Sequence, residues 1–437
     1  MENLLPTLLP IMREVLFLTW EVVKTWWWLV FPFLFYDRAR YLWFWWRQER
    51  WGATQPMMML EVRFPREVLK PMKAMENVFS GFWQMHDPPN DRERWFMGQY
   101  QLNFSLEIVS TEGKVHFYMR LPRKNRSLFE AAIYSQYAEA EVTEVEDYTK
   151  QVPRDIPNKD WNVWGTNYVL EKPDVYPIKT YLQFFEENPD TEEEKRIDPL
   201  ALLTEGLSQL GPGEHMWVQL ILVPVLPEEE HYVERGQKIV DKLVRRQEKV
   251  NPSVTGDIKD AGSILLTGKT PGAGAEEPRE LIPPEMKLTP GERDIVTAID
   301  QKISKYQFKT VIRFAYVAKR ENWFGAARAI PMSFFSQLST VNLNNLRPFR
   351  PTLTKVYTIF TWFLDKRRLY VRQRRLFRYY ISRLAPMFPD MVPGRFIMNT
   401  EELATIFHLP SEMVVSASGL SRVESKKGQA PSEIPRE

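Results

Sequence analysis

A hairpin signal stands at residues 101–121, which read QLNFSLEIVSTEGKVHFYMRL. Apolar side chains fill alternate positions on both sides of the turn, at Leu102, Phe104, Leu106, Ile108, Val115, Phe117, Met119 and Leu121. Such alternation is typical of strands with one buried face, and Gly113 suits a short hairpin loop. The stretch therefore predicts a β-hairpin with strands at 101–110 and 114–121.

The flanking segments extend the hairpin into a larger pattern. A strand at 57–64 and a helix at 67–83 are predicted before it, and a helix at 126–137 and a strand at 140–148 after it. This β-α-β-β-α-β order is that of a ferredoxin-like fold.

The same order recurs in the second half of the chain. The predicted elements are a strand near 168–183, a helix at 199–210, strands at 214–225 and 306–320, a helix at 322–339 and a last strand at 341–349. An insertion of about 80 residues, 226–305, separates the two middle strands, and loops this long are usually functional or disordered. We interpret it as a candidate interaction arm.

The predicted fold class is α+β, with two ferredoxin-like units. The predicted divisions are a membrane anchor at 1–52, a first unit at 53–150, a second unit at 151–350 with its insertion at 226–305, a basic helix and a docking helix within 351–410, and a disordered tail at 411–437.

The membrane anchor is predicted from residues 15–36, VLFLTWEVVKTWWWLVFPFLFY. A helix of this length can cross a hydrocarbon layer about 30 Å thick, although Glu21 and Lys24 interrupt it. The membrane-contacting residues would be Trp20, Trp26, Trp27, Trp28, Phe31 and Phe33. Arginines after the segment place the bulk of the chain in the cytoplasm by the positive-inside rule. An in-plane helix, a signal peptide and a buried soluble helix are the alternatives.

The composition and motifs of the chain argue against several kinds of functional site. The chain has no cysteine, and its five histidines show no metal-ligand spacing, so we expect no metal and no cofactor. The segment GSILLTGKTPGAG at 262–274 resembles a phosphate-binding loop, but five residues rather than four separate Gly262 from Gly268. We therefore expect no enzyme activity.

Charge is distributed unevenly along the chain. From Lys305 onward there are 22 Lys and Arg against 9 Asp and Glu, although the net charge of the whole chain is +2. The segment 361–385 predicts a helix with a narrow apolar stripe and a cationic surface. Its candidate binding residues are Arg367, Arg368, Arg372, Arg374, Arg375 and Arg378. Nucleic acid, anionic lipid and an acidic partner protein all fit such a helix.

A second C-terminal motif follows at 396–410, FIMNTEELATIFHLP. Asn399 and Glu402 have the spacing of a capping box, and Pro410 ends the helix. We predict that this helix docks a partner. Its docking residues would be Glu401, Leu403, Ile406 and Phe407.

Four blocks carry a resemblance to a known family. They are LEVRFPREVLKPMKAMENVFSG at 60–81, FSLEIVSTEGKVHFYMRLP at 104–122, AEAEVTEVEDYT at 138–149 and the motif at 396–410. Together they resemble the membrane-anchored N-terminal region of HerA-like DNA-translocation ATPases, which are similar to type IV secretion and conjugation ATPases and occur in candidate-phyla bacteria. The chain has no Walker motifs, so the resemblance implies a motor on a separate polypeptide.

The expected function is therefore a membrane-anchored, non-catalytic adaptor of a DNA-translocating or pilus-assembly ATPase. Its expected partners are a HerA-like ATPase, the membrane and DNA, and we expect an oligomer. Two alternatives stay open at this point: a scaffold of an envelope complex that never contacts DNA, and an uncharacterised membrane enzyme.

Overall fold

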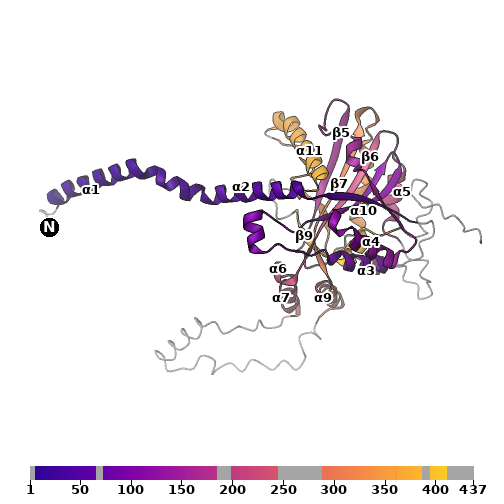
Figure 1. Cartoon of the computed structure of the whole chain (residues 1–437). Coiled ribbons are helices and arrows are strands. Elements are labelled where there is room, and N and C mark those ends of the chain that lie inside the picture. Colours follow the sequence, from indigo (N-terminus) through magenta and orange to yellow (C-terminus); the bar gives the residue numbers. More distant parts are fainter. Residues whose placement is uncertain are drawn as a thin grey trace, which may run out of the picture. The chain divides into compact units, whose positions relative to one another are not determined.

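A computed structural model describes residues 5–64, 72–184, 198–244, 288–359, 361–385 and 394–410. The chain divides into two compact units (Figure 1). The first combines Met1–Pro56 with Asp87–Leu102, and the second combines Met57–His86 with Asn103–Glu437.

The first unit consists mainly of helices. Its elements are α1 (Leu5–Trp26), the 3-10 turn η1 (Trp27–Leu29), α2 (Val30–Thr54) and the π-helical turn η2 (Glu93–Met97). Aromatic contacts hold η2 and the residues after it against α2. Phe44 lies 5.3 Å from Trp95, and Trp51 lies 5.1 Å from Tyr100, measured between ring centroids.

The predicted transmembrane anchor is wrong. Among the residues that the structure describes, no helix combines the length and the apolar character that crossing a membrane requires. The predicted span is divided, because α1 ends at Trp26 and a 3-10 turn follows. Glu21 and Lys24 also lie within α1, and indole rings are only weakly apolar. The single-pass membrane localisation derived from this segment is therefore wrong as well.

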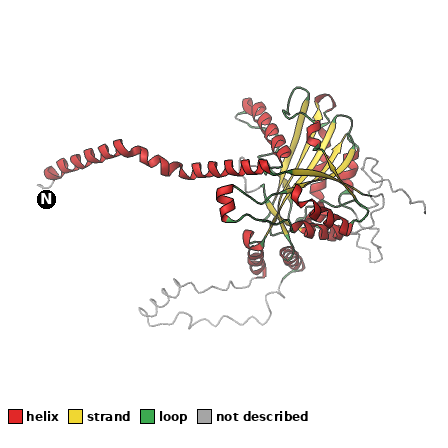
Figure 2. Ribbon diagram, viewed as in Figure 1, coloured by secondary structure: helices red, strands yellow, loops and turns green. Residues whose placement is uncertain are grey.

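The second unit contains a nine-stranded antiparallel sheet (Figure 2). Its strands are β1 (Met57–Arg63), β2 (Phe104–Thr111), β3 (Lys114–Pro122), β4 (Glu141–Val145), β5 (Trp161–Leu170), β6 (Glu214–Val225), β7 (Gln307–Lys319), β8 (Leu346–Pro348) and β9 (Phe396–Asn399). Eight of them follow the order β4-β1-β3-β2-β6-β7-β5-β8, and β9 pairs with β7. The predicted hairpin forms β2 and β3, with Gly113 at a φ of +83° in its turn.

The prediction of two separate ferredoxin-like units is also wrong. β2 pairs with β6 over eight residues, from Phe104 opposite Leu222 to Thr111 opposite His215. Strands of the two halves therefore share one sheet. The helices and strands of the first half lie close to their predicted places. In the second half, β5 begins at Trp161, before the strand predicted near 168–183. Sequence patterns within each half do not reveal which strand edges will meet.

Five helices cover one face of this sheet: α3 (Met72–Trp83), α4 (Arg126–Gln136), α5 (Ala201–Ser208), α10 (Ala329–Gln337) and α12 (Thr400–Ile406). The core on this side is aromatic. Phe82 of α3 lies 4.1 Å from Phe129 of α4 and 5.7 Å from Phe104 of β2, again between ring centroids. The opposite face carries α11 (Asp365–Ser382), which packs against β5 and β7 (Figure 1).

The insertion contributes a helical hairpin. Short α6 (Pro227–Glu230) leads into α7 (Tyr232–Val244), which packs against α9 (Pro290–Ile303) through Val240, Val244 and Ile299. The described parts of the predicted insertion are therefore helical. The phosphate-loop-like segment 262–274 and the tail 411–437 lie outside the described residues.

Candidate nucleic-acid interface

Hydrogen bonds to Asp365 fix the beginning of helix α11. Asp365 in its first turn accepts hydrogen bonds from the backbone N–H and the hydroxyl of Thr358, at 2.8 and 2.6 Å. These bonds lower the pKa of Asp365 below its ordinary value. A carboxylate also suits a helix N-terminus because of the helix dipole. Thr358 is thereby tied to the first turn of α11.

The apolar stripe of α11 is buried against the sheet. Phe377 and Tyr380 contact Trp217 of β6, with ring centroids 6.3 and 5.4 Å apart. Gln373 donates from its amide to the carbonyl oxygen of Val163 at 2.7 Å. The packed stripe fixes which side of the helix faces solvent.

The six predicted binding arginines divide into two sets. Arg367, Arg375 and Arg378 are exposed on the solvent side of the helix. The other three are half-buried and donate hydrogen bonds to neighbouring groups of the protein. Arg368 donates to Thr361, Arg372 donates to three backbone carbonyls at 3.2–3.4 Å, and Arg374 donates to the Tyr370 hydroxyl at 2.9 Å. The first set and exposed Lys366 lie on the side of α11 that faces solvent.

Exposed rings accompany these charges. The segment before α11 and its first turns expose Tyr357 (88%), Ile359 (78%), Trp362 (72%), Phe363 (65%), Tyr370 (44%) and Val371 (42%). Large exposed apolar groups in one short segment are typical of an interaction site. We call the set Tyr357, Trp362, Phe363, Lys366, Arg367, Tyr370, Arg375 and Arg378 the basic–aromatic surface.

The C-terminal end of α11 is held by a buried ionic cluster that sequence reasoning missed. Arg383, at a φ of +51°, caps the helix and is 2% exposed. Its guanidinium donates to Glu107 at 3.0 and 3.2 Å and to Asp147 at 2.6 and 3.0 Å. Arg383 lies within the segment predicted to form a cationic helix, but its side chain is buried in the fold.

The charges of this cluster stabilise one another. Burial alone would raise the pKa of Glu107, but the positive charge and hydrogen bonds of Arg383 hold that pKa below its ordinary value. Asp147 behaves in the same way. Tyr148 donates to Glu107 at 2.6 Å and shares a 2.9 Å hydrogen bond with Tyr380, so both tyrosines join helix and sheet.

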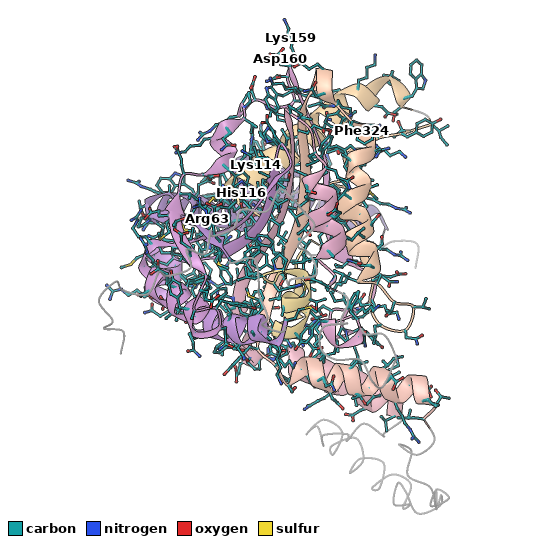
Figure 3. The ribbon with its side chains drawn as sticks, turned by 90° about the vertical axis from the view of Figure 1, so that its right-hand side faces the viewer. Arg63, Lys114, His116, Lys159, Asp160 and Phe324 are labelled. Carbon is teal, nitrogen blue, oxygen red and sulfur yellow. The ribbon has the colours of Figure 1, made fainter. Side chains whose placement is uncertain are left out.

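This cluster belongs to a longer line of polar side chains across the sheet. Successive strand pairings align Glu61, Tyr118, Glu107, Gln219, Arg313 and Asn167. At one end, Glu61 pairs with His116 at 2.6 Å and with Arg63 at 2.8 Å (Figure 3). The carboxylates of Glu61 and Glu107 both have cationic partners, so these ion pairs tie neighbouring elements together.

At the other end of the line, two buried polar side chains lack hydrogen-bond partners among the described residues. Arg313 is fully buried, and burial lowers its pKa to about 10. One of its nitrogens donates to the Leu384 carbonyl, whereas its Nε and Nη1 have no hydrogen-bond partner among the described residues. The side-chain amide of Asn167, opposite it in β5, is also unpaired there. Such groups cost about 1–3 kcal/mol each when left unsatisfied.

The predicted docking residues lie inside the fold. Leu403, Ile406 and Phe407 are fully buried, and Glu401 is 5% exposed. Phe407 packs on Phe117 of β3, with ring centroids 5.8 Å apart, and Glu401 pairs with Lys305 at 2.6 Å. The capping box is present as predicted, but it closes a helix whose side chains all serve internal packing.

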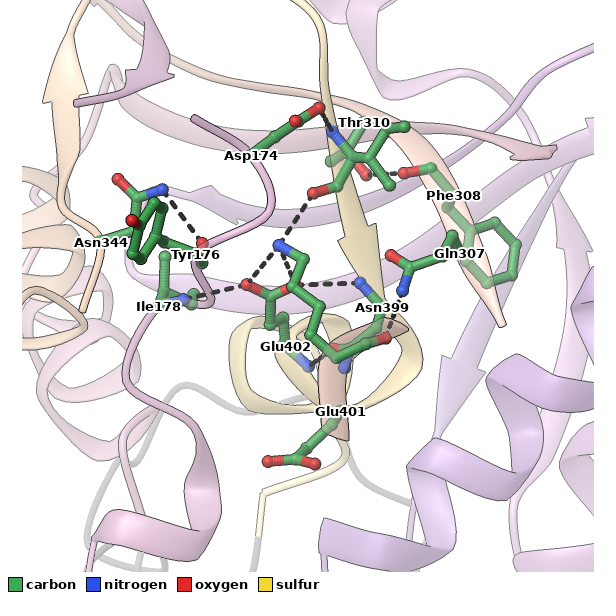
Figure 4. Close-up of polar contacts among 12 residues, drawn as sticks. Asp174, Tyr176, Ile178, Gln307, Phe308, Thr310, Asn344, Asn399, Glu401 and Glu402 are labelled. Carbon is green, nitrogen blue, oxygen red and sulfur yellow. Dashed lines mark hydrogen bonds and ion pairs between the residues drawn. The ribbon is translucent and has the colours of Figure 1, made fainter. Parts of the chain in front are cut away.

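The neighbouring Glu402 forms a buried ion pair that holds this segment in the fold (Figure 4). Its carboxylate lies 2.8 Å from the ammonium of Lys302, at the end of α9, and accepts a hydrogen bond from the backbone of Ile178 at 2.9 Å. Lys302 also donates to the Ile397 carbonyl at 3.1 Å. Burial raises the pKa of Glu402 despite this partner. The buried pair joins the insertion hairpin to the C-terminal segment.

The residues predicted to touch a membrane lie in the first unit, and those whose side chains are described are exposed. Trp20, Trp26, Trp27, Trp28 and Phe31 are between 40% and 64% exposed in the first unit. The side chain of Phe33 lies outside the described part of the chain. Within the described ranges, no group of three or more His, Asp and Glu side chains has a metal-binding arrangement.

Fold and surface together define a mixed α/β protein that combines a broad antiparallel sheet with an exposed basic–aromatic surface. Residues 52–329 match the family described as Domain of unknown function (DUF8128), and the chain belongs to that family. The match contains the strands β1 to β7 and the helices α3, α4 and α5, but it ends before α11. No curated protein matches the chain.

Proposed function

We propose that this protein is a non-catalytic adaptor that binds single-stranded DNA through the basic–aromatic surface. The observation that carries the proposal is the placement of exposed cations on α11 beside exposed rings of the same helix and of the segment before it. Cations attract the phosphate backbone, and aromatic rings stack on unpaired bases. Duplex DNA hides its base faces, so the rings favour a single strand.

The helix is suited to this role because it is fixed at both ends. Asp365 ties its beginning to Thr358, and Arg383 ties its end to Glu107 and Asp147. A bound strand would therefore meet side chains whose backbone is already ordered. Such preorganisation reduces the entropy lost on binding.

The motor that this adaptor would serve is proposed from the sequence resemblance. DNA-translocation ATPases of the HerA-like type act on DNA, and an adaptor that holds a single strand would suit such a motor on a separate chain. The buried positions of Leu403, Ile406 and Phe407 mean that a motor would have to bind another surface than the one first predicted.

The test is a fluorescence-anisotropy titration of a labelled oligonucleotide with the full chain. Lys366→Gln, Arg367→Gln and Arg378→Gln, combined, should weaken binding at least tenfold, because each removes a phosphate contact. The matched control neutralises three exposed lysines of other elements, Lys73, Lys114 and Lys238, and should leave affinity within about twofold.

The rings are tested separately. Trp362→Ala should weaken binding by about tenfold or more, since stacking on a base contributes about 1–3 kcal/mol. Phe324→Ala is the matched control, because Phe324 (labelled in Figure 3) is 60% exposed and follows β7, outside the basic–aromatic surface. Equal losses from both variants would contradict the proposal. Preference for anionic vesicles over the oligonucleotide would assign the surface to lipid instead.

A further inference from the structure

The segment that precedes α11 is held in place by polar contacts. Among its described residues, 355–359 and 361–364, none is buried, and Tyr357 and Trp362 are 88% and 72% exposed. The segment includes the short 3-10 turn η10 (Trp362–Leu364). A stretch of chain with few buried apolar contacts has low local stability of its own. The order of this segment therefore depends on its hydrogen bonds.

Two threonines connect the segment to the first turn of α11. Thr358 donates from its hydroxyl to Asp365 at 2.6 Å, and Arg368 donates to the hydroxyl of Thr361 at 2.5 Å. The two threonine hydroxyls lie 3.1 Å apart and share a hydrogen bond. Asp365 and Arg368 are three residues apart on α11, and their charged groups lie 3.6 Å apart. We call these four connected side chains the threonine clamp.

Each threonine of the clamp is next to an exposed ring in the sequence. Thr358 follows Tyr357, and Thr361 precedes Trp362. The threonine hydroxyls bond to side chains of α11, whereas both rings are exposed to solvent. The clamp therefore fixes the backbone from which each ring projects.

Arg372 holds the chain that leads into this segment. Its Nη1 donates to the backbone carbonyls of Arg350, Leu353 and Lys355, at 3.2–3.4 Å. Arg368 and Arg372 are two of the predicted binding residues, but both donate to the chain before α11. Their effect on a bound strand would therefore act through the residues that they hold.

We infer that the threonine clamp positions the rings of Tyr357 and Trp362 for stacking on the bases of a single strand, an inference that rests on the proposed DNA binding. Thr358, Thr361 and Arg368 are thus positioning residues. Holding the rings in place before binding reduces the conformational entropy that is lost when a strand binds. The threonine hydroxyls carry no charge, so their removal should lower affinity without changing how affinity depends on salt.

Charge-neutral variants test the clamp by fluorescence anisotropy, with the same oligonucleotide and the full chain. Thr358→Val combined with Thr361→Val removes both hydroxyls, and affinity should fall about tenfold with an unchanged salt dependence. Thr358→Ser combined with Thr361→Ser keeps both hydroxyls and should bind within about twofold of wild type. Adding Trp362→Ala to the valine pair should weaken binding by less than a further factor of about two, because the ring has already lost its position.

Hydrogen exchange followed by mass spectrometry measures the clamp in the absence of DNA. Peptides covering 355–364 should exchange faster in the valine pair than in wild type, whereas peptides from the C-terminal half of α11 should be unchanged. The inference is overturned if exchange over 355–364 does not change, if the valine pair binds as tightly as wild type, or if its loss of affinity adds fully to that of Trp362→Ala. A wild type that binds no oligonucleotide would contradict the proposed function itself, and the exchange measurement distinguishes that result from a failed clamp.

Discussion

Replacing Arg383 with methionine tests how α11 is attached to the sheet. Arg383 is 2% exposed and makes four hydrogen bonds to the carboxylates of Glu107 and Asp147, at 2.6–3.2 Å. Glu107 has no exposure, so the variant leaves an uncompensated buried charge. Breaking such a pair costs about 3–5 kcal/mol of the free energy of unfolding. Guanidinium denaturation, followed by circular dichroism, measures this loss.

Matched variants separate the ionic contribution from simple truncation. Arg378→Met changes an exposed arginine of the same helix and should alter stability by less than about 0.5 kcal/mol. Glu107→Gln combined with Arg383→Met removes both charges, so the double variant should be more stable than Arg383→Met alone. A double variant that is less stable than both single variants would contradict the ionic account.

The pH dependence of stability should have opposite signs for the Glu107 contribution in wild type and in Arg383→Met. In wild type, Arg383 holds the pKa of Glu107 below its unfolded value, so this contribution is present at neutral pH and is lost only as pH falls through the lowered folded pKa. In Arg383→Met, burial without a cation raises that pKa above its unfolded value. The variant should therefore gain stability as pH falls from 8 toward 5. A variant whose stability falls over that range would refute the reasoning.

Further predictions concern other contacts of the same unit. Gly165→Ala should destabilise the protein and loosen α11, because a Cβ at Gly165 would lie 2.2 Å from the Phe314 carbonyl oxygen and 2.9 Å from Leu376; thermal unfolding measures it. Lys302→Met should lower the free energy of unfolding by about 3–5 kcal/mol by stranding Glu402, and adding Glu402→Gln should recover part of the loss. Purified protein should not hydrolyse ATP, and phosphate release abolished by Lys269→Ala would contradict this expectation.

Local patterns predicted the elements better than their assembly. Alternation identified β2 and β3, and the capping box at Asn399 and Glu402 identified the beginning of α12. The pairing of β2 with β6 joins residues more than a hundred positions apart, and nothing in either strand specifies that partner. The error of two separate units follows from this, because alternation identifies the buried face of a strand but not the strand beside it.

The arginines show the same limit within a single helix. Periodicity places Arg367 and Arg378 away from the apolar stripe, and the structure agrees. It cannot show that Arg368 and Arg372 bond to the segment before the helix, or that Arg383 turns into a buried cluster. Glu107, an acid in an otherwise apolar alternating strand, was the available signal, because a buried carboxylate requires a cationic partner.

The clearest error is the membrane span predicted from the aromatic N-terminal segment. Trp26, Trp27 and Trp28 were read as an interfacial belt at the end of one membrane span. The helix ends there instead, and the charges of Glu21 and Lys24 lie within it.

The salt dependence of oligonucleotide affinity tests the central claim most directly. If Lys366, Arg367, Arg375 and Arg378 all contact phosphates of a single strand, log affinity should fall with log salt at a slope of about −2.8. Affinity should then weaken roughly fifty-fold between 50 and 200 mM salt, and the variant lacking Lys366, Arg367 and Arg378 charges should have a slope near −0.7. A slope of about zero in wild type, or an unchanged slope in the variant, would contradict DNA binding by this surface.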